Sequence, residues 1–394
     1  VGGALAVTTD ANSGSIDLGD LEVNGTIALT TDTGGAATVV NDAGINFASS
    51  TVRGNLSATA AAGDITDTGV LAITGTSTFT VANGQSVILD ESSTFSTVTF
   101  ASAGTIASIE VNDSNALDLG TLTTTGNLTV TAGGNITDSG TVTVGGNLIA
   151  TTDANSGVID LGTLAVDGTI ALTTHNNGAA TVVNDAGLNF AASTVGGALS
   201  ATATTGNITD SGALTITGTS TFVTIANDAT ITLDQGGHAF TGALLITTND
   251  TSTDTAGDVT ISAGSSAALD FGNSTIDGDL IATSSNATGI TDSGAMTVRG
   301  TASFQTTATN ADISLGTSTL GDGTGTDTIT LNTTGSTGHA TLDNGTTVVA
   351  LGTSAASLVT NVGGNLTLTS GAAAGITDSA TVTVGGNLIA TTDA

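Results

Sequence analysis

The chain of 394 residues has no cysteine, proline, tryptophan or tyrosine. Without cysteine it has no disulfide, no thiolate metal ligand and no cysteine nucleophile. Without tryptophan and tyrosine it lacks the bulky fillers of a thick core, and its nine phenylalanines supply nearly all of the large side chains. Because proline cannot donate a hydrogen bond to a strand ladder, its absence is compatible with a chain made of paired strands.

Positive charge is almost absent as well. Arg53 and Arg299 are the two basic residues against 34 acidic ones, so the formal net charge is −32 and there is no lysine. Binding to nucleic acid or to an anionic membrane surface needs clustered basic residues, so we expect no nucleic-acid partner. No apolar run approaches the roughly 18 residues that span a bilayer, so we expect no membrane insertion by this segment. The acidity is typical of a soluble extracellular polymer.

The residues that are present favour strands. The chain contains 55 glycines and 38% hydrophobic residues, mainly Val, Ile, Leu and Ala. Its mean hydropathy is +0.33. Disorder is the alternative for a chain so rich in Gly, Thr, Ser and Asn, but the apolar and β-branched content opposes it.

A long internal repeat governs the organisation. Residues 1–79 recur at 144–222, and the phrase VGGNLIATTDA begins again at residues 384–394. We therefore predict one continuous segment, 1–394, of a longer array, with internal repeats 1–143 and 144–383 and the start of a further copy at 384–394. A shorter phrase, Ile-Thr-Asp, recurs at Ile65–Asp67, Ile136–Asp138, Ile208–Asp210, Ile290–Asp292 and Ile376–Asp378.

A still shorter period points to the fold. Segments of the type Gly-x-Leu recur about every 20 residues, as at Leu128, Leu148 and Ile170, and each alternates apolar with polar residues. Short alternating strands separated by Gly, Asn, Asp and Ser predict an all-β parallel β-helix, or β-solenoid, with about 20–25 residues per coil. Immunoglobulin-like sandwiches are the alternative, but they use thicker fillers and prolines and do not explain the short period.

No set of residues predicts catalysis. His175, His238 and His339 stand in turn-like contexts, and we interpret all three as surface loop residues. Polysaccharide cleavage needs paired carboxylates or a base beside cationic groups, usually with aromatic platforms for the sugar, and most of these parts are missing. We therefore expect a protein that is not an enzyme.

Calcium is the one cofactor that the sequence suggests. Asp322 and Asp327 enclose a glycine-rich loop, and the stretch Asn249–Asp258 is also acidic. Calcium prefers six to eight such oxygen ligands. The tandem GGxGxD pattern of calcium-binding β-rolls is absent, however, and we favour metal-free Asp-Gly turns and no cofactor.

The phrases GNLTVTAGGNITDSGTVTVGGNLIATT (Gly126–Thr152) and VGGALSATATTGNITDSGALTITGTSTF (Val195–Phe222) carry a resemblance. They are similar to the repeat regions of filamentous haemagglutinin-like bacterial surface adhesins and giant secreted β-helix repeat proteins. The resemblance implies a right-handed parallel β-helix that forms long fibres at the bacterial cell surface. The amino-terminal secretion domain of that family is missing from this sequence.

We interpret the chain as a non-catalytic structural segment of an extracellular bacterial fibre or giant surface protein that associates with itself. One alternative is an adhesin that binds glycans or host surfaces through non-repeated loops such as Gln235–Ser266. Another is an ice-binding solenoid, suggested by Thr-x-Thr segments such as Thr141–Thr143.

Overall fold

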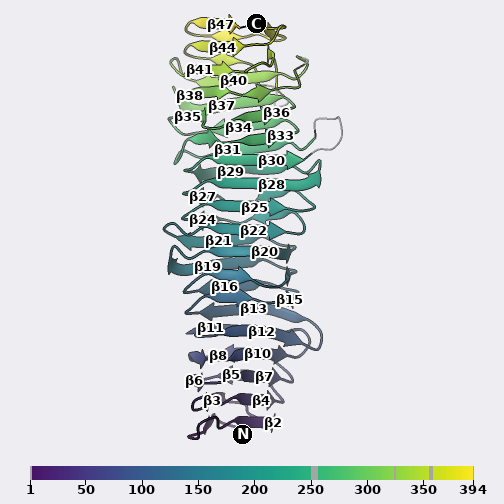
Figure 1. Ribbon diagram of the computed structural model, residues 1–394, viewed down its shortest axis with the longest axis vertical. Coiled ribbons are helices and arrows are strands. Elements are labelled where there is room, and N and C mark those ends of the chain that lie inside the picture. The colour runs from purple at the N-terminus through teal and green to yellow at the C-terminus, as the bar shows by residue number, and fades with distance from the viewer. Residues whose placement is uncertain (1, 250–255, 324, 355–357, 394) are drawn as a thin grey trace. The chain divides into compact units, whose positions relative to one another are not determined.

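The computed structural model describes residues 2–249, 256–323, 325–354 and 358–393. The chain consists of two compact units, Val1–Asp185 and Ala186–Ala394, and each is an all-β parallel solenoid (Figure 1). The chain makes about 18 turns, spaced about 21 residues apart, and the described residues form no helix. The predicted fold and coil length are confirmed, whereas the right-handed sense and the single continuous segment remain predictions.

Each turn of the first unit adds strands to two sheets. One sheet contains β1 (Leu5–Thr8), β3 (Thr26–Thr30), β5 (Ile45–Phe47), β6 (Ser50–Val52), β8 (Ile65–Asp67), β9 (Leu71–Ile73), β11 (Gln85–Ser93), β13 (Ile106–Asp113), β16 (Leu128–Ala132), β19 (Leu148–Asn155) and β21 (Ile170–His175). The other contains β2 (Ile16–Leu21), β4 (Ala37–Asn41), β7 (Leu56–Ala60), β10 (Thr76–Val81), β12 (Thr97–Ser102), β14 (Leu117–Leu119), β15 (Leu122–Thr124), β17 (Ile136–Asp138), β18 (Val142–Val144), β20 (Ile159–Val166) and β22 (Ala180–Asn184).

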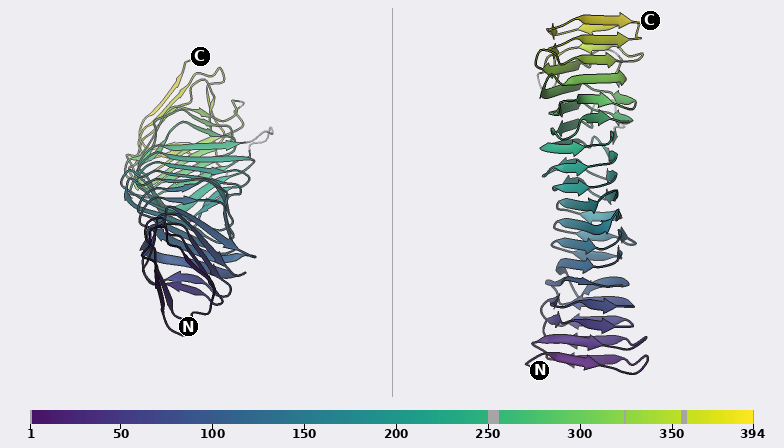
Figure 2. Two further views of the ribbon diagram at one scale, coloured as in Figure 1. Left: turned by 60° about the horizontal axis from the view of Figure 1, so that its bottom comes forward. Right: turned by 90° about the vertical axis from the view of Figure 1, so that its left-hand side faces the viewer.

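The second unit is built in the same way, and its strands also lie one above another as rungs (Figure 2). One sheet contains β23 (Leu188–Phe190), β24 (Ser193–Val195), β26 (Ile208–Asp210), β27 (Leu214–Ile216), β29 (Ile231–Phe240), β31 (Val259–Ala263), β34 (Leu280–Ser284), β37 (Ala302–Thr309), β40 (Ile329–Thr334), β42 (Val349–Leu351), β43 (Asn361–Val362), β45 (Ile376–Asp378) and β46 (Thr383–Val384). The other contains β25 (Leu199–Ala203), β28 (Ser220–Asn227), β30 (Leu244–Asn249), β32 (Leu269–Phe271), β33 (Ser274–Ile276), β35 (Gly289–Asp292), β36 (Met296–Val298), β38 (Asp312–Thr317), β39 (Thr319–Leu320), β41 (Ala340–Asp343), β44 (Leu366–Ser370) and β47 (Leu388–Thr392).

The alternation of apolar and polar residues along each strand directs successive side chains to the core and to the surface. In β3, Ile27 and Leu29 are fully buried, while Ala28 between them is half-buried. Glu22 and Asn24 are exposed on either side of the buried Val23. In the second repeat copy these two positions are occupied by Ala165 and Asp167. A slip of one residue would bring the apolar set into water, so this pattern fixes the register of the strands.

Phenylalanines supply the largest fully buried side chains of the narrow core. Phe79 contacts three other rings, with centroid distances of 6.4 Å to Phe47, 6.0 Å to Phe95 and 6.3 Å to Phe100. In the second unit, the ring of Phe222 lies between two others in the same manner. Edge-to-face and offset contacts of this kind stabilise by about 0.5–1.5 kcal/mol per pair beyond burial alone.

The 143-residue repeat corresponds to a whole number of turns, but the shorter Ile-Thr-Asp repeat does not. Seven successive parallel pairings lead from β1 to β19, in which Leu5 and Leu148 hold equivalent places in the 143-residue repeat. The Ile-Thr-Asp phrase recurs after about half that length, or about three and a half turns. In the first unit β8 and β17 therefore lie in opposite sheets. In the second unit β26, β35 and β45 alternate between its two sheets.

Candidate functional site

The Gly-Asn-Leu phrase is a device for stacking turns. A Cβ atom on Gly146 would lie 2.7 Å from the carbonyl carbon of Gly126 in the preceding turn, closer than a Cβ tolerates, so glycine is required for this approach. Beside it, the Asn127 Oδ1 accepts a hydrogen bond from the Asn147 N–H at 2.9 Å, and the Asn147 Oδ1 accepts one from the Thr169 N–H at 2.9 Å. These side chains thus form a ladder beside the backbone ladder.

The aspartate of the Ile-Thr-Asp phrase holds a bulge in the next rung. Asp138 Oδ1 accepts a hydrogen bond from the Gly162 N–H at 2.9 Å, and its Oδ2 accepts from the Thr163 N–H and Oγ1, both at 2.7 Å. At this place the pairing of β20 with β22 shifts register between Leu161 and Leu164. A bulge leaves backbone groups without ladder partners, and the carboxylate binds these N–H groups.

Three other copies of this aspartate act in the same way. Their donors are the Asp90 and Glu91 N–H groups for Asp67, the Asp234 and Gln235 N–H groups for Asp210, and the Gly316 N–H and Ser318 Oγ for Asp292. We call these four residues the bulge aspartates. The sequence identified the repeated phrase but not this role, because the donors lie 23 to 26 positions further along the chain.

Buried asparagines make a second recurring cross-link. Asn41 is fully buried; its Oδ1 accepts from the Val23 N–H at 2.8 Å, and its Nδ2 donates to the carbonyl oxygens of Val23 at 3.0 Å and Gly44 at 2.7 Å. Asn184 and Asn344 bind the backbone of the preceding turn in the same manner. The side-chain amide replaces a peptide group where the strand leaves the ladder.

The three histidines occupy two different environments. His175 and His339 are exposed, as the sequence predicted. The prediction of a surface position is wrong for His238, whose side chain is fully buried beside the fully buried side chain of Asp210. The flanking glycines made its context turn-like, but β29 continues through the bulge and directs the ring into the core.

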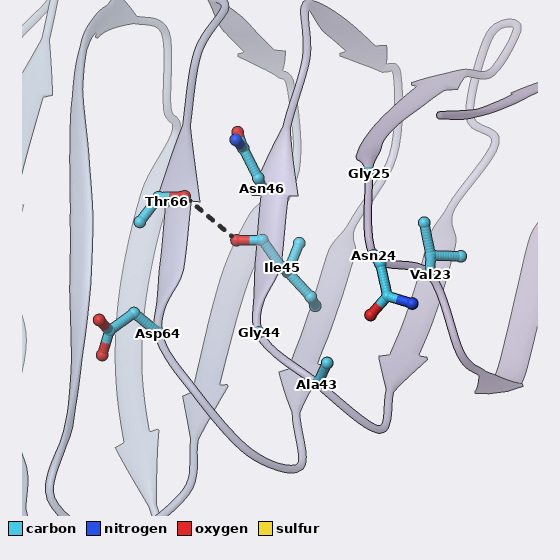
Figure 3. Close-up of a pocket in the computed structure, with 9 residues that line it drawn as sticks. All are labelled: Val23, Asn24, Gly25, Ala43, Gly44, Ile45, Asn46, Asp64 and Thr66. Carbon is cyan, nitrogen blue, oxygen red and sulfur yellow. Dashed lines mark hydrogen bonds between the residues drawn. The ribbon is translucent and has the colours of Figure 1, made fainter. Parts of the chain in front are cut away.

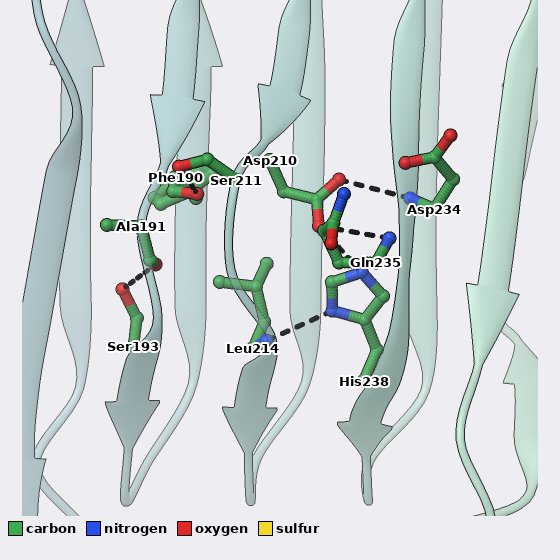
Figure 4. A network of polar contacts seen from close by, with 9 residues as sticks. All are labelled: Phe190, Ala191, Ser193, Asp210, Ser211, Leu214, Asp234, Gln235 and His238. Atoms are coloured by element: carbon green, nitrogen blue, oxygen red, sulfur yellow. Dashed lines mark hydrogen bonds and ion pairs between the residues drawn. The ribbon is translucent and has the colours of Figure 1, made fainter.

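His238 belongs to a polar network in the second unit (Figure 4). Its Nδ1 accepts a hydrogen bond from the Leu214 N–H at 3.0 Å, and its Nε2 lies 3.1 Å from the Asp210 Oδ2. The ring of Phe240 stacks on it at a centroid distance of 5.5 Å. Burial lowers the pKa of His238, although the Asp210 carboxylate opposes that shift. With neither nitrogen open to solvent, the pair has no access to a substrate.

A shallow hollow of about 320 Å³ lies on the first unit between three successive turns (Figure 3). Its polar side chains are Asn24, Asn46, Asp64 and Thr66. The Asp64 Oδ1 accepts from the Ser86 N–H at 2.7 Å, and Thr66 Oγ1 donates to a backbone carbonyl at 3.4 Å. The carboxylate is therefore engaged in holding the next turn, and no second acid or base lines the hollow.

The two acidic stretches considered for calcium lie in the second unit. Asp322 donates its N–H to the Asp327 Oδ2 at 3.2 Å, and burial raises the pKa of Asp327. Residue 324 of this loop, and residues 250–255 of the stretch Asn249–Asp258, lie outside the described residues. Within the described part of the chain no three His, Asp or Glu side chains are grouped so as to hold a metal ion.

Both arginines lie on the surface. Arg53 is exposed, and the Arg299 Nη1 pairs with the Asp277 Oδ1 at 3.0 Å while remaining 59% exposed. No described helix is long and apolar enough to cross a membrane.

Comparison with known proteins gives a family but no function. No curated protein and no solved structure is significantly similar to the chain. One family, described as repeats of unknown function (DUF5649), matches residues 34–102, 103–163, 177–247 and 256–319, about two thirds of the chain. Each match spans about three to three and a half turns. The chain therefore belongs to this family of repeats of unknown function.

Proposed function

We propose that the chain is a non-catalytic structural segment of an extracellular bacterial fibre or giant surface protein. The observation that carries this proposal is the alternation of the Ile-Thr-Asp phrase between the two sheets of each unit. Both sheets of a unit are thereby built from the same phrases, and neither face is specialised. An enzyme, an adhesin or an ice-binding protein needs one distinctive face, whereas a load-bearing rod does not.

The polar side chains support the same proposal. Three kinds of polar side chain are hydrogen-bonded to the backbone of a neighbouring turn. They are the bulge aspartates, the buried asparagines and the asparagines of the Gly-Asn-Leu turns. Such bonds add stiffness along the stacking direction to the backbone ladder. The acidic exterior keeps the segment soluble and makes lateral association depend on salt or divalent cations. We propose self-association into fibres at the bacterial cell surface as its assembly.

The alternatives have weaker support. Thr131, Thr151 and Thr173 stack in register on the outer face of the first unit. In the adjacent column, however, Thr129 is followed by Ile149, so the flat threonine array of an ice-binding face is interrupted. For an adhesin, the non-repeated stretch Gln235–Ser266 contributes strands and the buried His238 to the core, which leaves less of it for a ligand.

Electron microscopy of the purified chain, with and without a calcium chelator, tests the proposal. We expect uniform rods with an axial repeat of about 4.8 Å. Val130→Asp places a charge in the fully buried core and should abolish the rods, while Thr129→Asp, on the outer face of the same strand, should leave them intact. Beads on a flexible string would refute the structural role, and so would thermal hysteresis or saturable binding on a glycan array with rods absent.

A further inference from the structure

We propose that the corner formed by Asp67 and Ser93 in the first unit is a proton-binding site, and that the equivalent corner in the second unit replaces the proton with the side chain of His238. The rod would then contain a pH-sensitive segment whose response is set by one position of the repeat. This inference is independent of the proposed structural function.

The two corners occupy the same place in the repeat. Leu71 and Leu214 are equivalent residues of the two copies, 143 positions apart. The Leu71 N–H donates to the Ser93 Oγ at 2.9 Å, and the Leu214 N–H donates to the His238 Nδ1 at 3.0 Å. Ser93 and His238 therefore satisfy the same backbone donor, each beside a bulge aspartate.

The carboxyl group of Asp67 has one oxygen without a partner. The residue is 6% exposed, and its Oδ1 accepts from the Asp90 and Glu91 N–H groups at 3.1 and 3.5 Å. Its Oδ2 is buried and has no hydrogen-bond partner among the described residues. Asp138, the next copy, has donors on both oxygens and is only half-buried.

Among the described residues, the charges that act on the Asp67 carboxyl group are negative. Asp90 and Glu91 face it from β11, and Asp64 precedes it on its own segment, while β5 contributes the uncharged Phe47 opposite it. Burial raises the pKa of Asp67 to about 7, and the charges of Asp90 and Glu91 act in the same direction. The N–H groups of Asp90 and Glu91 favour the carboxylate, but burial and the neighbouring negative charges outweigh them and favour the protonated form.

A second buried acid adjoins this corner. Ser93 pairs in register with Asp113, which is 1% exposed and has its own buried Oδ2 without a hydrogen-bond partner among the described residues. Burial raises the pKa of Asp113 as well. In the second unit, His238 pairs instead with Ala263, so that corner has one acid fewer.

His238 supplies what the first corner lacks. Because its Nδ1 accepts the Leu214 N–H, the neutral ring carries its proton on Nε2, which faces the Asp210 Oδ2 at 3.1 Å. The acidic Glu91 of the first corner is replaced by Gln235, so Asp234 is the other charge facing the pair. The Asp210 Oδ2, which corresponds to the unpartnered oxygen of Asp67, accepts a hydrogen bond from the Gln235 N–H at 3.3 Å and faces the imidazole Nε2.

The consequence is a defined dependence on pH. Folded Asp67 holds a proton more tightly than the unfolded chain, so its stabilising effect is complete below pH 4 and is lost as the pH rises through about 7. One pKa unit corresponds to a tenfold change, so local opening of β11 should become roughly 1000-fold more favourable across this window.

Hydrogen exchange of the full chain, measured by mass spectrometry on peptides covering 85–95 and expressed as protection factors between pH 4 and 8, tests the proposal. Asp67→Asn mimics the protonated acid and should reduce the pH dependence to the contribution of Asp113, leaving the variant better protected than the wild type at pH 8. The matched Asp138→Asn should lower protection of 158–166 at every pH, because that carboxylate uses both oxygens.

His238→Ser provides the reverse exchange. It places a serine at the position that corresponds to Ser93 and removes the imidazole that faces Asp210, while the Gln235 N–H stays on the Asp210 Oδ2. The protection of 231–240 should then fall as the pH rises. A ¹³C-carboxyl aspartate resonance that titrates near pH 7, present in the wild type and absent in Asp67→Asn, should identify the proton directly. Loss of protection by Asp67→Asn at pH 8, or the absence of that resonance, would overturn the proposal.

Discussion

Replacing Asn41 by alanine should be among the most damaging single changes in the first unit. Its amide makes three hydrogen bonds to the backbone, with the N–H and the carbonyl of Val23 and with the carbonyl of Gly44. The residue is fully buried, so water cannot replace the lost partners. Each buried polar group left unpaired costs about 1–3 kcal/mol. We therefore expect a loss of about 3–5 kcal/mol in the free energy of unfolding.

Asn24→Ala is the matched control, because Asn24 is exposed and adjoins Val23. This change should alter stability by no more than about 0.5 kcal/mol. Urea unfolding of the full chain, followed by far-ultraviolet circular dichroism, would measure both variants. Hydrogen exchange at residues 21–25 would localise the effect, since 4 kcal/mol corresponds to about a 1000-fold loss of protection. A difference below about 1 kcal/mol between the two variants would refute the assigned role of the buried amide.

Two further changes test the stacking of turns and the buried imidazole. Gly146→Ala forces a Cβ against the Gly126 backbone and should lower the free energy of unfolding by about 1–3 kcal/mol. The control Gly120→Ala has open space around the new Cβ and should be neutral or stabilising by up to about 1 kcal/mol in the same urea assay. Because burial lowers the pKa of His238, its stabilising effect should be lost as the pH falls below about 6.5. His238→Gln, which should remove that acid sensitivity, is measured by hydrogen exchange of 231–240 between pH 5 and 8; an unchanged profile would count against the buried neutral imidazole.

Most of the fold could be predicted from the sequence, because the relevant signals are local and periodic. Alternation at period two placed Ile27 and Leu29 inside, and the recurrence of Gly-x-Leu about every 20 residues gave the coil length. The repeated Ile-Thr-Asp phrase was also visible. Its function was not, since the donors that bind Asp138 are on the next turn, 24 and 25 residues away.

His238 shows why the remaining features needed the tertiary structure. Its neighbours Gly236 and Gly237 are typical of a surface turn, and no local pattern reveals that it takes the place of Ser93 in the other repeat copy. Because of insertions, Ser93 and His238 are not separated by the 143 positions that separate equivalent residues of 1–79 and 144–222. Equivalence became apparent only when both residues were seen to accept the N–H of corresponding leucines.

The sequence by itself determined that this chain is a stack of short parallel strands with a narrow aliphatic core, because strand periodicity and turn chemistry are properties of neighbouring residues. Only the tertiary structure decided which polar groups meet between turns, which sheet each repeated phrase joins, and which of the four bulge aspartates lacks a partner for its second oxygen. All three features depend on the register between neighbouring turns. The register depends in turn on the length of every loop and strand that separates paired residues about 21 positions apart.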